Sequence, residues 1–422
     1  MRDRHSLPIL EDTRQTIWQL LAIQLSGWTS LPILATSVFL LGENNFYGSL
    51  FTIIVANALL WFIRMAIILM SYKNRQSTLD LAQDYLGKFG GYCIAFLLLF
   101  STLVWFITQT SAASDTLTRL IRIKEHPEID QFTQVSVLLG VASTLFCMEG
   151  MVILRKLSTF SFPILLTAFF IVIAMTPFQL PIEKTASFSL QGLTIILITN
   201  LGFTADLPTF FRHSRSLYTS IIALTVLQIL SIILAILGLF LGAIITSDKL
   251  QINESVIITS GNSSLVYFFA LFVFISTICA NVANVYSSSV GWEIIAPSAL
   301  VGRKEYLILG LGLTTIFILV SKLFSVDHLL HTADSSLVNL TLVLIFAYLI
   351  KQITKGPISL FSQWIYLTAW MVSTIVNTLQ INHIAFYIFS PIVTSLIIIF
   401  FTFMLGFLVK WIHPRLFKTV KL

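Results

Sequence analysis

ITNLGFTADLP, residues 198–208, interrupts a long apolar run with hydroxyls, an amide, a Gly–aromatic step and a proline. A related pattern, AIQLSGWTSLP, occupies residues 22–32 near the beginning of the chain. Glycine and proline at membrane depth free backbone groups that need other partners, and paired breaks of this kind mark the binding site of many transporters. The two stretches predict two interrupted helices at matching positions in two halves of the chain. Ordinary kinks lined by small residues are the alternative.

The composition indicates a membrane protein. Of the 422 residues, 56% are apolar and 10% are charged, and the mean hydropathy is +0.91. Apolar runs of ~20 residues cross a bilayer as helices, because hydrocarbon offers the backbone no other hydrogen-bond partners. We predict one all-α integral membrane domain over residues 1–422. Its twelve transmembrane helices are expected at 17–41, 50–71, 92–114, 134–153, 157–176, 192–210, 219–246, 264–290, 305–323, 337–354, 363–380 and 386–412.

The positive charges favour one orientation of these helices. If the N-terminus faces the cytoplasm, eighteen Lys and Arg residues fall in segments on that side and six on the other. Cytoplasmic segments of membrane proteins are enriched in Lys and Arg. We therefore expect a multi-pass protein of the cell (inner) membrane with both termini in the cytoplasm.

The residue pattern also argues against several functions. The basic residues are scattered over separate loops, which does not suit a nucleic-acid partner. Cys93, Cys147 and Cys279 lie in or beside apolar runs and lack the spacing of metal ligands. The chain has no HExxH, P-loop or nucleophile-elbow motif. We predict no enzyme activity, no cofactor and no metal.

Polar residues inside the predicted helices are the candidates for function. Trp105 and Gln109 lie four residues apart and so share one helical face. An indole beside an amide suits a flat solute, because the indole stacks on a ring and the amide bonds to its edge. Asn281, Asn284 and Ser288 form a polar stripe on another helix. That stripe can line a solute path or join helices, at ~0.6 kcal/mol per hydrogen bond.

Ionisable residues in or near the spans are functional candidates as well, because charge in hydrocarbon is costly. Asp206, Glu149 and Asp115 are the candidates for gating or for carrying a coupling proton. A salt-bridged rim is the alternative for Asp206 and Glu149. Arg64 belongs to this group as well, and extension of its guanidinium to the nearer membrane surface is the alternative to a functional role.

Together these residues resemble the nucleobase–cation symporter family (purine/cytosine permease type), most closely its cytosine-permease branch. The resemblance runs from the first predicted helix to the eighth and rests on four places. They are the stretch from Ala56 through Lys88-Phe-Gly-Gly to Trp105, the pair Trp105-x-x-x-Gln109, the segment Thr204–Arg212, which is similar to Thr-Ala-Asp-Phe-x-Arg-Phe, and the segment Asn281–Ser289.

The resemblance implies a fold and a cargo. The fold is the 5+5 inverted-repeat core of the amino acid–polyamine–cation superfamily, with repeats at approximately 15–176 and 190–354 and peripheral helices at 363–412. The cargo is a small planar heterocycle, such as cytosine, a purine, a hydantoin, allantoin or a vitamin, imported with a coupling ion by alternating access. Its site lies between helices 1, 3, 6 and 8. The expected substrate-binding residues are Trp105, Gln109, Ser26, Gly27, Thr199, Asn200, Asn281 and Asn284.

Two departures concern the binding and cation sites. Leu197 stands where the family has an aromatic side chain for the second face of the ring, so Thr199 and Asn200 are the expected groups at the ring edge. Cys279 and Ala280 stand where sodium-coupled relatives have adjacent hydroxyl residues. Neither side chain offers the oxygen ligand that a hard cation prefers. Proton coupling is therefore expected in preference to sodium coupling.

A third departure is DHLLHTADSS, residues 327–336, where the family has a proline-bearing stretch. We expect this segment to be a solvated outer loop. A pH-sensing pair of histidines is the alternative.

Other functions remain in competition. The same fold could carry an amino acid or another small solute, whose carboxylate would bind at a helix N-terminus. A membrane-embedded enzyme or sensor would bind its ligand without accumulating it. The sequence offers that alternative neither a catalytic cluster nor a soluble signalling domain. A channel fits interrupted helices less well than a gated site does.

Overall fold

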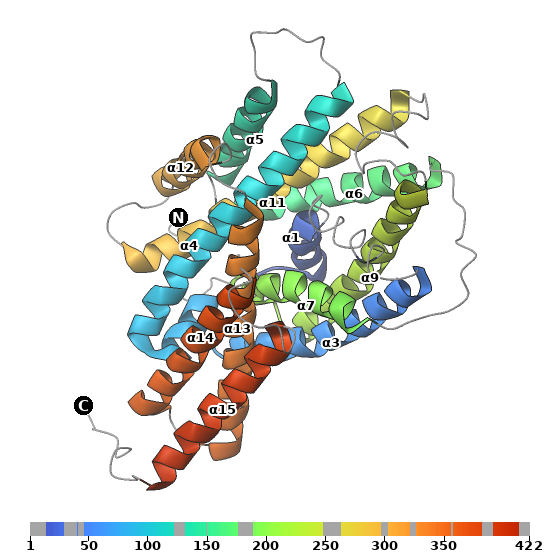
Figure 1. Ribbon diagram of the computed structural model, residues 1–422. Coiled ribbons are helices and arrows are strands. Elements are labelled where there is room, and N and C mark those ends of the chain that lie inside the picture. The colour runs from blue at the N-terminus through green and yellow to red at the C-terminus, as the bar shows by residue number, and fades with distance from the viewer. Residues whose placement is uncertain are drawn as a thin grey trace.

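The fold is built from helices that coincide with the predicted spans. The computed structural model describes residues 14–28, 40, 46–121, 131–148, 150–175, 189–247, 263–296, 303–320, 326–355, 358–381 and 391–412. Each predicted span contains a helix, and α7 and α8 share the sixth span. The described helices are α1 (Ile17–Trp28), α3 (Phe46–Tyr72), α4 (Thr78–Ile121), α5 (Gln131–Cys147), α6 (Met151–Met175), α7 (Leu190–Thr204), α8 (Leu207–Phe211), α9 (Leu217–Ser247), α11 (Ser263–Ile295), α12 (Arg303–Val320), α13 (Val326–Thr354), α14 (Leu360–Ile381) and α15 (Pro391–Ile412) (Figure 1).

Seven of the described helices are long and apolar enough to cross a membrane, namely α3, α4, α6, α9, α11, α13 and α15. Shorter apolar segments lie in α5, α7 and α12. In the described part of the chain the β-structure consists of one isolated bridge, between Gln15 and Ser214. The chain is an all-α, multi-pass membrane protein.

Reciprocal hydrogen bonds define where two of the helices begin. At the start of α4, the Ser77 N–H donates to the Asp80 carboxylate at 2.8 Å and the Asp80 N–H donates to the Ser77 hydroxyl at 3.2 Å. Thr16 and Gln19 make the same exchange at the start of α1. These capping boxes provide partners for backbone donors that a first helical turn cannot pair.

Gly87 divides α4 into a short segment and a long membrane span. Its φ of 78° belongs to a region that side chains with a Cβ rarely adopt. Gln363 of α14 packs against this kink and donates to the carbonyl of Asp84 at 3.1 Å. The turn expected near the Gly-rich connection is made by Gly87, whereas Gly90 and Gly91 continue the helix.

Two predicted boundaries are wrong. The fifth helix was expected to follow Arg155 and Lys156, but the turn lies at Gly150, with a φ of 60°, and both basic residues lie within α6. The tenth helix begins at Val326 instead of residue 337, so Asp334 lies in a helix. At Asp334 the helix can continue because the Trp105 indole of α4 gives the carboxylate a hydrogen-bond partner.

The helices form a bundle with two peripheral members (Figure 1). α4 and α11 make the most extensive helix–helix contact of the described chain. α3 packs on both α7 and α9, and α1 packs on α9 and α11. α14 and α15 lie side by side at the edge of the bundle, with α14 packed against α13 and α4.

α5 and α12 meet through two reciprocal Gly–Thr contacts. A Cβ on Gly140 would lie 2.4 Å from the Thr314 hydroxyl, and a Cβ on Gly310 would lie 2.4 Å from the Thr144 hydroxyl. Each threonine donates to the carbonyl of the glycine on its own helix, at 2.8 Å in α5 and 2.9 Å in α12. Reciprocal contacts of this kind arise between elements related by a two-fold axis. The predicted inverted repeats require such a relation for these two helices, and their boundaries stay a prediction.

Gly140→Ala should destabilise the protein, because the added Cβ would overlap Thr314. A hydrogen bond to the carbonyl of Gly310 in α12 holds that threonine in place. Overpacking costs about 1–3 kcal/mol, which a lower melting temperature in detergent would report. Gly312→Ala on α12 is the matched control, since nothing lies within 4 Å of its added Cβ. Equal melting temperatures for the two variants would contradict this account of the α5–α12 contact.

Candidate functional site

The sixth predicted helix is interrupted between α7 and α8. α7 ends at Thr204, and Pro208 stands in the first turn of α8. Side chains of two neighbouring helices donate to carbonyls around this break. Thr78 of α4 donates to the carbonyl of Ala205 at 2.6 Å, and Arg64 of α3 donates to the carbonyl of Asn200 at 3.2 Å. The interruption predicted from the sequence is confirmed.

Arg64 is fully buried beside the break. Its guanidinium donates to the Thr204 hydroxyl at 3.1 Å and to the Gln228 amide oxygen at 2.7 Å. Gln228 in turn donates to the amide oxygen of Asn57. The alternative that Arg64 reaches the membrane surface is wrong, because its partners lie inside the bundle on α7 and α9. The network joins α3, α7 and α9 into one unit.

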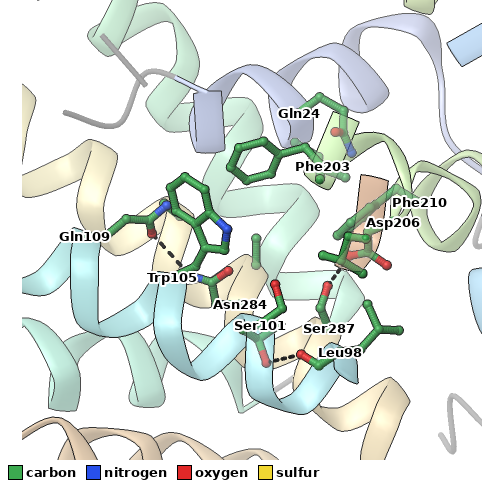
Figure 2. Close-up of a pocket in the computed structure, with 16 residues that line it drawn as sticks. Gln24, Leu98, Ser101, Trp105, Gln109, Phe203, Asp206, Phe210, Asn284 and Ser287 are labelled. Atoms are coloured by element: carbon green, nitrogen blue, oxygen red, sulfur yellow. Dashed lines mark hydrogen bonds between the residues drawn. The ribbon is translucent and has the colours of Figure 1, made fainter. Parts of the chain in front are cut away.

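A cavity of about 90 Å³ lies beside the break, walled by α1, α4, α7, α8, α11 and α13 (Figure 2). One buried water needs roughly 10–15 Å³ on the same measure, so several waters or a small ring would fit. Trp105, Gln109, Asn284 and Asp206 are the predicted site residues that line it.

Two aromatic rings form part of the wall. The rings of Trp105 on α4 and Phe203 on α7 have centroids 4.6 Å apart and planes tilted by 49°. Leu197 is buried and does not line the cavity. Phe203, in the Gly–aromatic step before the break, places a second aromatic ring in this wall. It lies six residues after Leu197 on the same helix and therefore on a different helical face.

Gln109 of α4 and Asn284 of α11 form an amide pair in the wall (Figure 2). The Asn284 amide donates to the Gln109 amide oxygen at 3.2 Å. This bond leaves the Gln109 amino group as a donor and the Asn284 carbonyl as an acceptor. Gln24 and Ser101 also line the cavity, and neither side chain has a hydrogen bond within the described residues. The cavity therefore has polar groups ready for a ligand.

The three acidic candidates are separated by the structure. Asp206 lies in the cavity wall at the helix break, where its carboxylate accepts a hydrogen bond from Ser287 of α11 (Figure 2). Asp115 lies on α4 outside the cavity lining. Glu149 lies outside the described residues, as do residues 29–39, which follow α1. Ser26 and Gly27 occupy the last described turn of α1.

Part of the polar stripe on α11 joins helices. Asn281 donates to the Thr110 hydroxyl of α4 at 2.9 Å, and Ser288 shares a hydrogen bond of 2.7 Å with Thr102 of α4. Of the three stripe residues, Asn284 alone lines the cavity. The interpretation as helix–helix contacts therefore holds for Asn281 and Ser288. Ala280, at one of the two altered cation-site positions, also lines the cavity.

Thr199 and Asn200 lie away from the cavity lining. The Thr199 hydroxyl donates to the carbonyl of Ile195 in its own helix at 3.0 Å. The Asn200 side chain accepts from Arg64 at 3.3 Å and donates to its own helix. In this conformation both side chains stabilise α7 and its contact with α3.

Asp334 is a candidate that the sequence reasoning missed. Its side chain is 3% exposed, and its carboxylate accepts the indole N–H of Trp105 at 2.8 Å. A Cβ on Gly202 would lie 3.1 Å from the same carboxylate oxygen, so the glycine lets α7 approach α13 closely. The expected solvated loop is wrong here, because α13 already includes this residue. The available signal was a lone carboxylate directly before a long apolar run.

Beyond α8, a group of residues that we call the Arg75 cluster joins distant parts of the chain: Gln15, Arg75, Arg212, His213 and Ser214. The Gln15 N–H donates to the carbonyl of His213 at 2.7 Å, and Arg75 donates to the carbonyls of Arg212 and Ser214. Burial, with a smaller effect from Arg212, lowers the pKa of His213 to about 3. The imidazole therefore stays neutral at physiological pH and accepts a hydrogen bond from Arg212 at 3.3 Å.

Comparison with solved structures shows the fold of known transporters. One similar structure is Mhp1, described as a nucleobase–cation–symport-1 family transporter in a closed conformation with bromovinylhydantoin bound. It has a TM-score of 0.72 and 14% sequence identity, and the match covers 98% of this chain and 96% of the Mhp1 chain. Its inward-facing conformation has a TM-score of 0.59 and 15% identity, covering 96% and 89%. A Na⁺-coupled sialic acid symporter in a substrate-bound outward-open state has a TM-score of 0.62 and 13% identity, covering 94% and 90%.

At these identities the likeness concerns the fold. The sequence itself matches no family model and no curated protein. The fold expected from the family resemblance is confirmed, and the structures that share it are transporters rather than enzymes.

Arg64→Lys should lower the melting temperature although it preserves the positive charge. A lysine cannot reproduce the planar fork that bonds to Thr204, Gln228 and Asn200 together, and each lost charged hydrogen bond costs about 1.5–3 kcal/mol. Phe62→Leu is the control on the same helix, because Phe62 is 66% exposed on the outside of the bundle. An unchanged melting temperature for Arg64→Lys would show that charge alone matters there.

Arg75→Asn should open the cavity on the α8 side. Asn tolerates the left-handed backbone that Arg75 adopts, with a φ of 53°, so the variant isolates the lost hydrogen bonds. Weakening the cluster by about 1.4 kcal/mol raises the open population tenfold. A cysteine introduced by Ala283→Cys, with the native cysteines replaced, should react correspondingly faster with a maleimide. Lys73→Ala, two residues away and exposed, is the control, and equal rates would show that the Arg75 cluster does not limit access to the cavity.

Proposed function

We propose that the protein is a secondary active transporter that imports a small planar heterocycle by alternating access across the cell (inner) membrane. Cytosine, purines, hydantoins, allantoin and ring-containing vitamins are the candidate substrates. The single observation that carries the proposal is the cavity that joins an aromatic wall to an amide pair, at a helix break within a transporter fold. The expected orientation, with cytoplasmic termini, is part of the proposal.

The aromatic wall suits a flat ring. A ring sandwiched between Trp105 and Phe203 would need about 7 Å between them, twice the contact distance of two carbon atoms. The centroids lie 4.6 Å apart, so a ligand in the present conformation stacks on one exposed face of the pair. Insertion between the rings requires movement of Phe203, and Phe203 stands at the α7 break, where the backbone can accommodate it.

The amide pair suits the edge of a lactam or an amidine. Gln109 and Asn284 together present one donor and one acceptor, and reversing both amides would preserve that combination. A ring with adjacent N–H and C=O groups, or with adjacent amino and ring-nitrogen groups, would bond to both. Buried polar groups discriminate strongly against analogues that leave them unpaired. The site therefore supports nucleobase-like and hydantoin-like rings over purely apolar ones.

The ion that we propose to be coupled to substrate transport is the proton. The side chains of Cys279 and Ala280 contain no oxygen atom. Sodium prefers oxygen ligands. This arrangement supports a carrier that does not use a sodium ion bound at these positions.

Trp105→Leu and Gln109→Leu should each weaken binding of the heterocycle to the purified protein. Stacking of a base on an aromatic side chain contributes about 1–3 kcal/mol, which corresponds to roughly a tenfold to hundredfold higher Kd. Equilibrium dialysis with labelled cytosine, hypoxanthine, allantoin and hydantoin would measure it. Thr108→Val is the control on α4, since its hydroxyl bonds within its own helix at 2.9 Å. Unchanged binding in Trp105→Leu would contradict stacking of the ring on Trp105.

A further inference from the structure

Asp334 occupies the junction of three helices. α13, which carries it, packs against α4 and α7. Its Oδ1 accepts the Trp105 indole N–H of α4, and the same oxygen would lie 3.1 Å from a Cβ placed on Gly202 of α7. One carboxylate oxygen therefore contacts both the helix with the aromatic wall and the helix with the break.

Burial makes the ionisation of this carboxylate dependent on its partners. A charged group taken out of water is costly unless it is paired and hydrogen-bonded, and carboxylates inside membrane helices commonly serve proton relays. Within the described part of the chain, the side chain bonded to Asp334 is the neutral Trp105 indole, which can stabilise a carboxylate but cannot neutralise it. Binding of a proton is the remaining way to remove the charge.

Few charged residues surround this part of α13. α7 and α14 contain no Asp, Glu, Lys, Arg or His within their bounds. α3 contributes Arg64, bonded to Asn200 two residues before Gly202, and Asp206 follows at the break. The remaining charged or titratable residues on the packed helices are Asp80, Asp84, Tyr85, Lys88, Tyr92, Cys93, Asp115 and Arg119 of α4, Tyr47 and Tyr72 of α3, Asp327, His328, His331, Tyr348 and Lys351 of α13, Tyr366 of α14, and Lys410 of α15.

We propose that Asp334 binds the coupling proton and transmits its protonation state to the cavity through the hydrogen bond to Trp105. This inference rests on the proposed function, because it assigns the ion-binding group of the same carrier. The substrate contacts the far side of the indole whose N–H contacts the carboxylate. Proton and substrate thus act on one side chain from two directions.

The direction of coupling follows from hydrogen-bond strength. A hydrogen bond to an ionised acceptor is roughly twice as strong as one between neutral groups. The ionised carboxylate therefore holds the Trp105 indole firmly against α13, and protonation loosens that contact. Because coupling between two binding events is reciprocal, a substrate that prefers one orientation of Trp105 also changes the affinity of Asp334 for the proton.

Asp334→Asn separates proton binding from positioning. The asparagine oxygen can still accept the indole N–H, but the side chain no longer exchanges a proton. We would reconstitute wild type, Asp334→Asn and Asp115→Asn in liposomes and assay labelled cytosine, hypoxanthine, allantoin and hydantoin. Counterflow measures substrate movement without a driving ion, whereas accumulation under an imposed pH gradient measures proton coupling.

Asp334→Asn should preserve counterflow and lose accumulation driven by the pH gradient, while Asp115→Asn preserves both. Accumulation by Asp334→Asn at the wild-type level would overturn the inference, and so would its loss in Asp115→Asn alone. Absence of counterflow in the wild type would instead contradict the proposed function for these four substrates.

A measurement without substrate tests the proton site independently. The part of the intrinsic fluorescence that Trp105→Phe removes should titrate with pH in the wild type and should not titrate in Asp334→Asn. An identical titration in both proteins would overturn the inference even if transport is demonstrated. A titration that Asp334→Asn abolishes would support the proton site even if the transported substrate lies outside the panel.

Discussion

The structure depends on one constraint, which is that backbone groups exposed by a broken membrane helix need partners inside the protein. The break between α7 and α8 meets it with side chains from two other helices. Arg64 donates to the carbonyl of Asn200 and to Thr204, and Thr78 donates to the carbonyl of Ala205. These bonds join the break to α3 and α4. The cavity wall includes residues on both sides of the break, namely Phe203, Asp206 and Phe210.

Near the same break, an aromatic pair and a buried carboxylate lie close together. Gly202 lets α7 approach α13, and the next residue, Phe203, turns its ring toward Trp105. Trp105 in turn donates to Asp334. A ligand that stacks on the indole therefore touches a side chain already connected to a buried carboxylate. In the proposed mechanism, substrate and proton therefore act on the same side chain, Trp105.

Much of this architecture could be predicted from the sequence, because hydropathy and helix-breaking residues are local signals. They placed a helix in each of the twelve predicted ranges, and they located the break in the sixth helix. Trp105, Gln109 and Asn284 could be chosen because their spacing places amides and an aromatic ring on helical faces. The helix boundaries at Gly150 and Val326 could not be predicted, because a hydropathy profile ends a helix wherever polar residues begin.

Contacts between residues far apart in the sequence could not be predicted either. Trp105 and Asp334 are 229 positions apart, and Arg64 and Thr204 are 140 apart. No local pattern shows that a carboxylate beside an apolar run will meet an indole, or that a buried arginine will find amides instead of water. Phe203 was overlooked because only the contact between α7 and α4 shows that its ring meets Trp105. Residues whose role depends on pairing across the bundle therefore required the structure.

The most direct test of the central claim is uptake of labelled cytosine, hypoxanthine, allantoin and hydantoin by cells that lack their own permeases, with sodium replaced by choline. The account predicts concentrative uptake of at least one of these heterocycles that survives the replacement. Uptake that disappears without sodium would contradict the proposed coupling. Failure to take up any planar heterocycle, while an amino acid is accumulated, would contradict the assignment of the cavity.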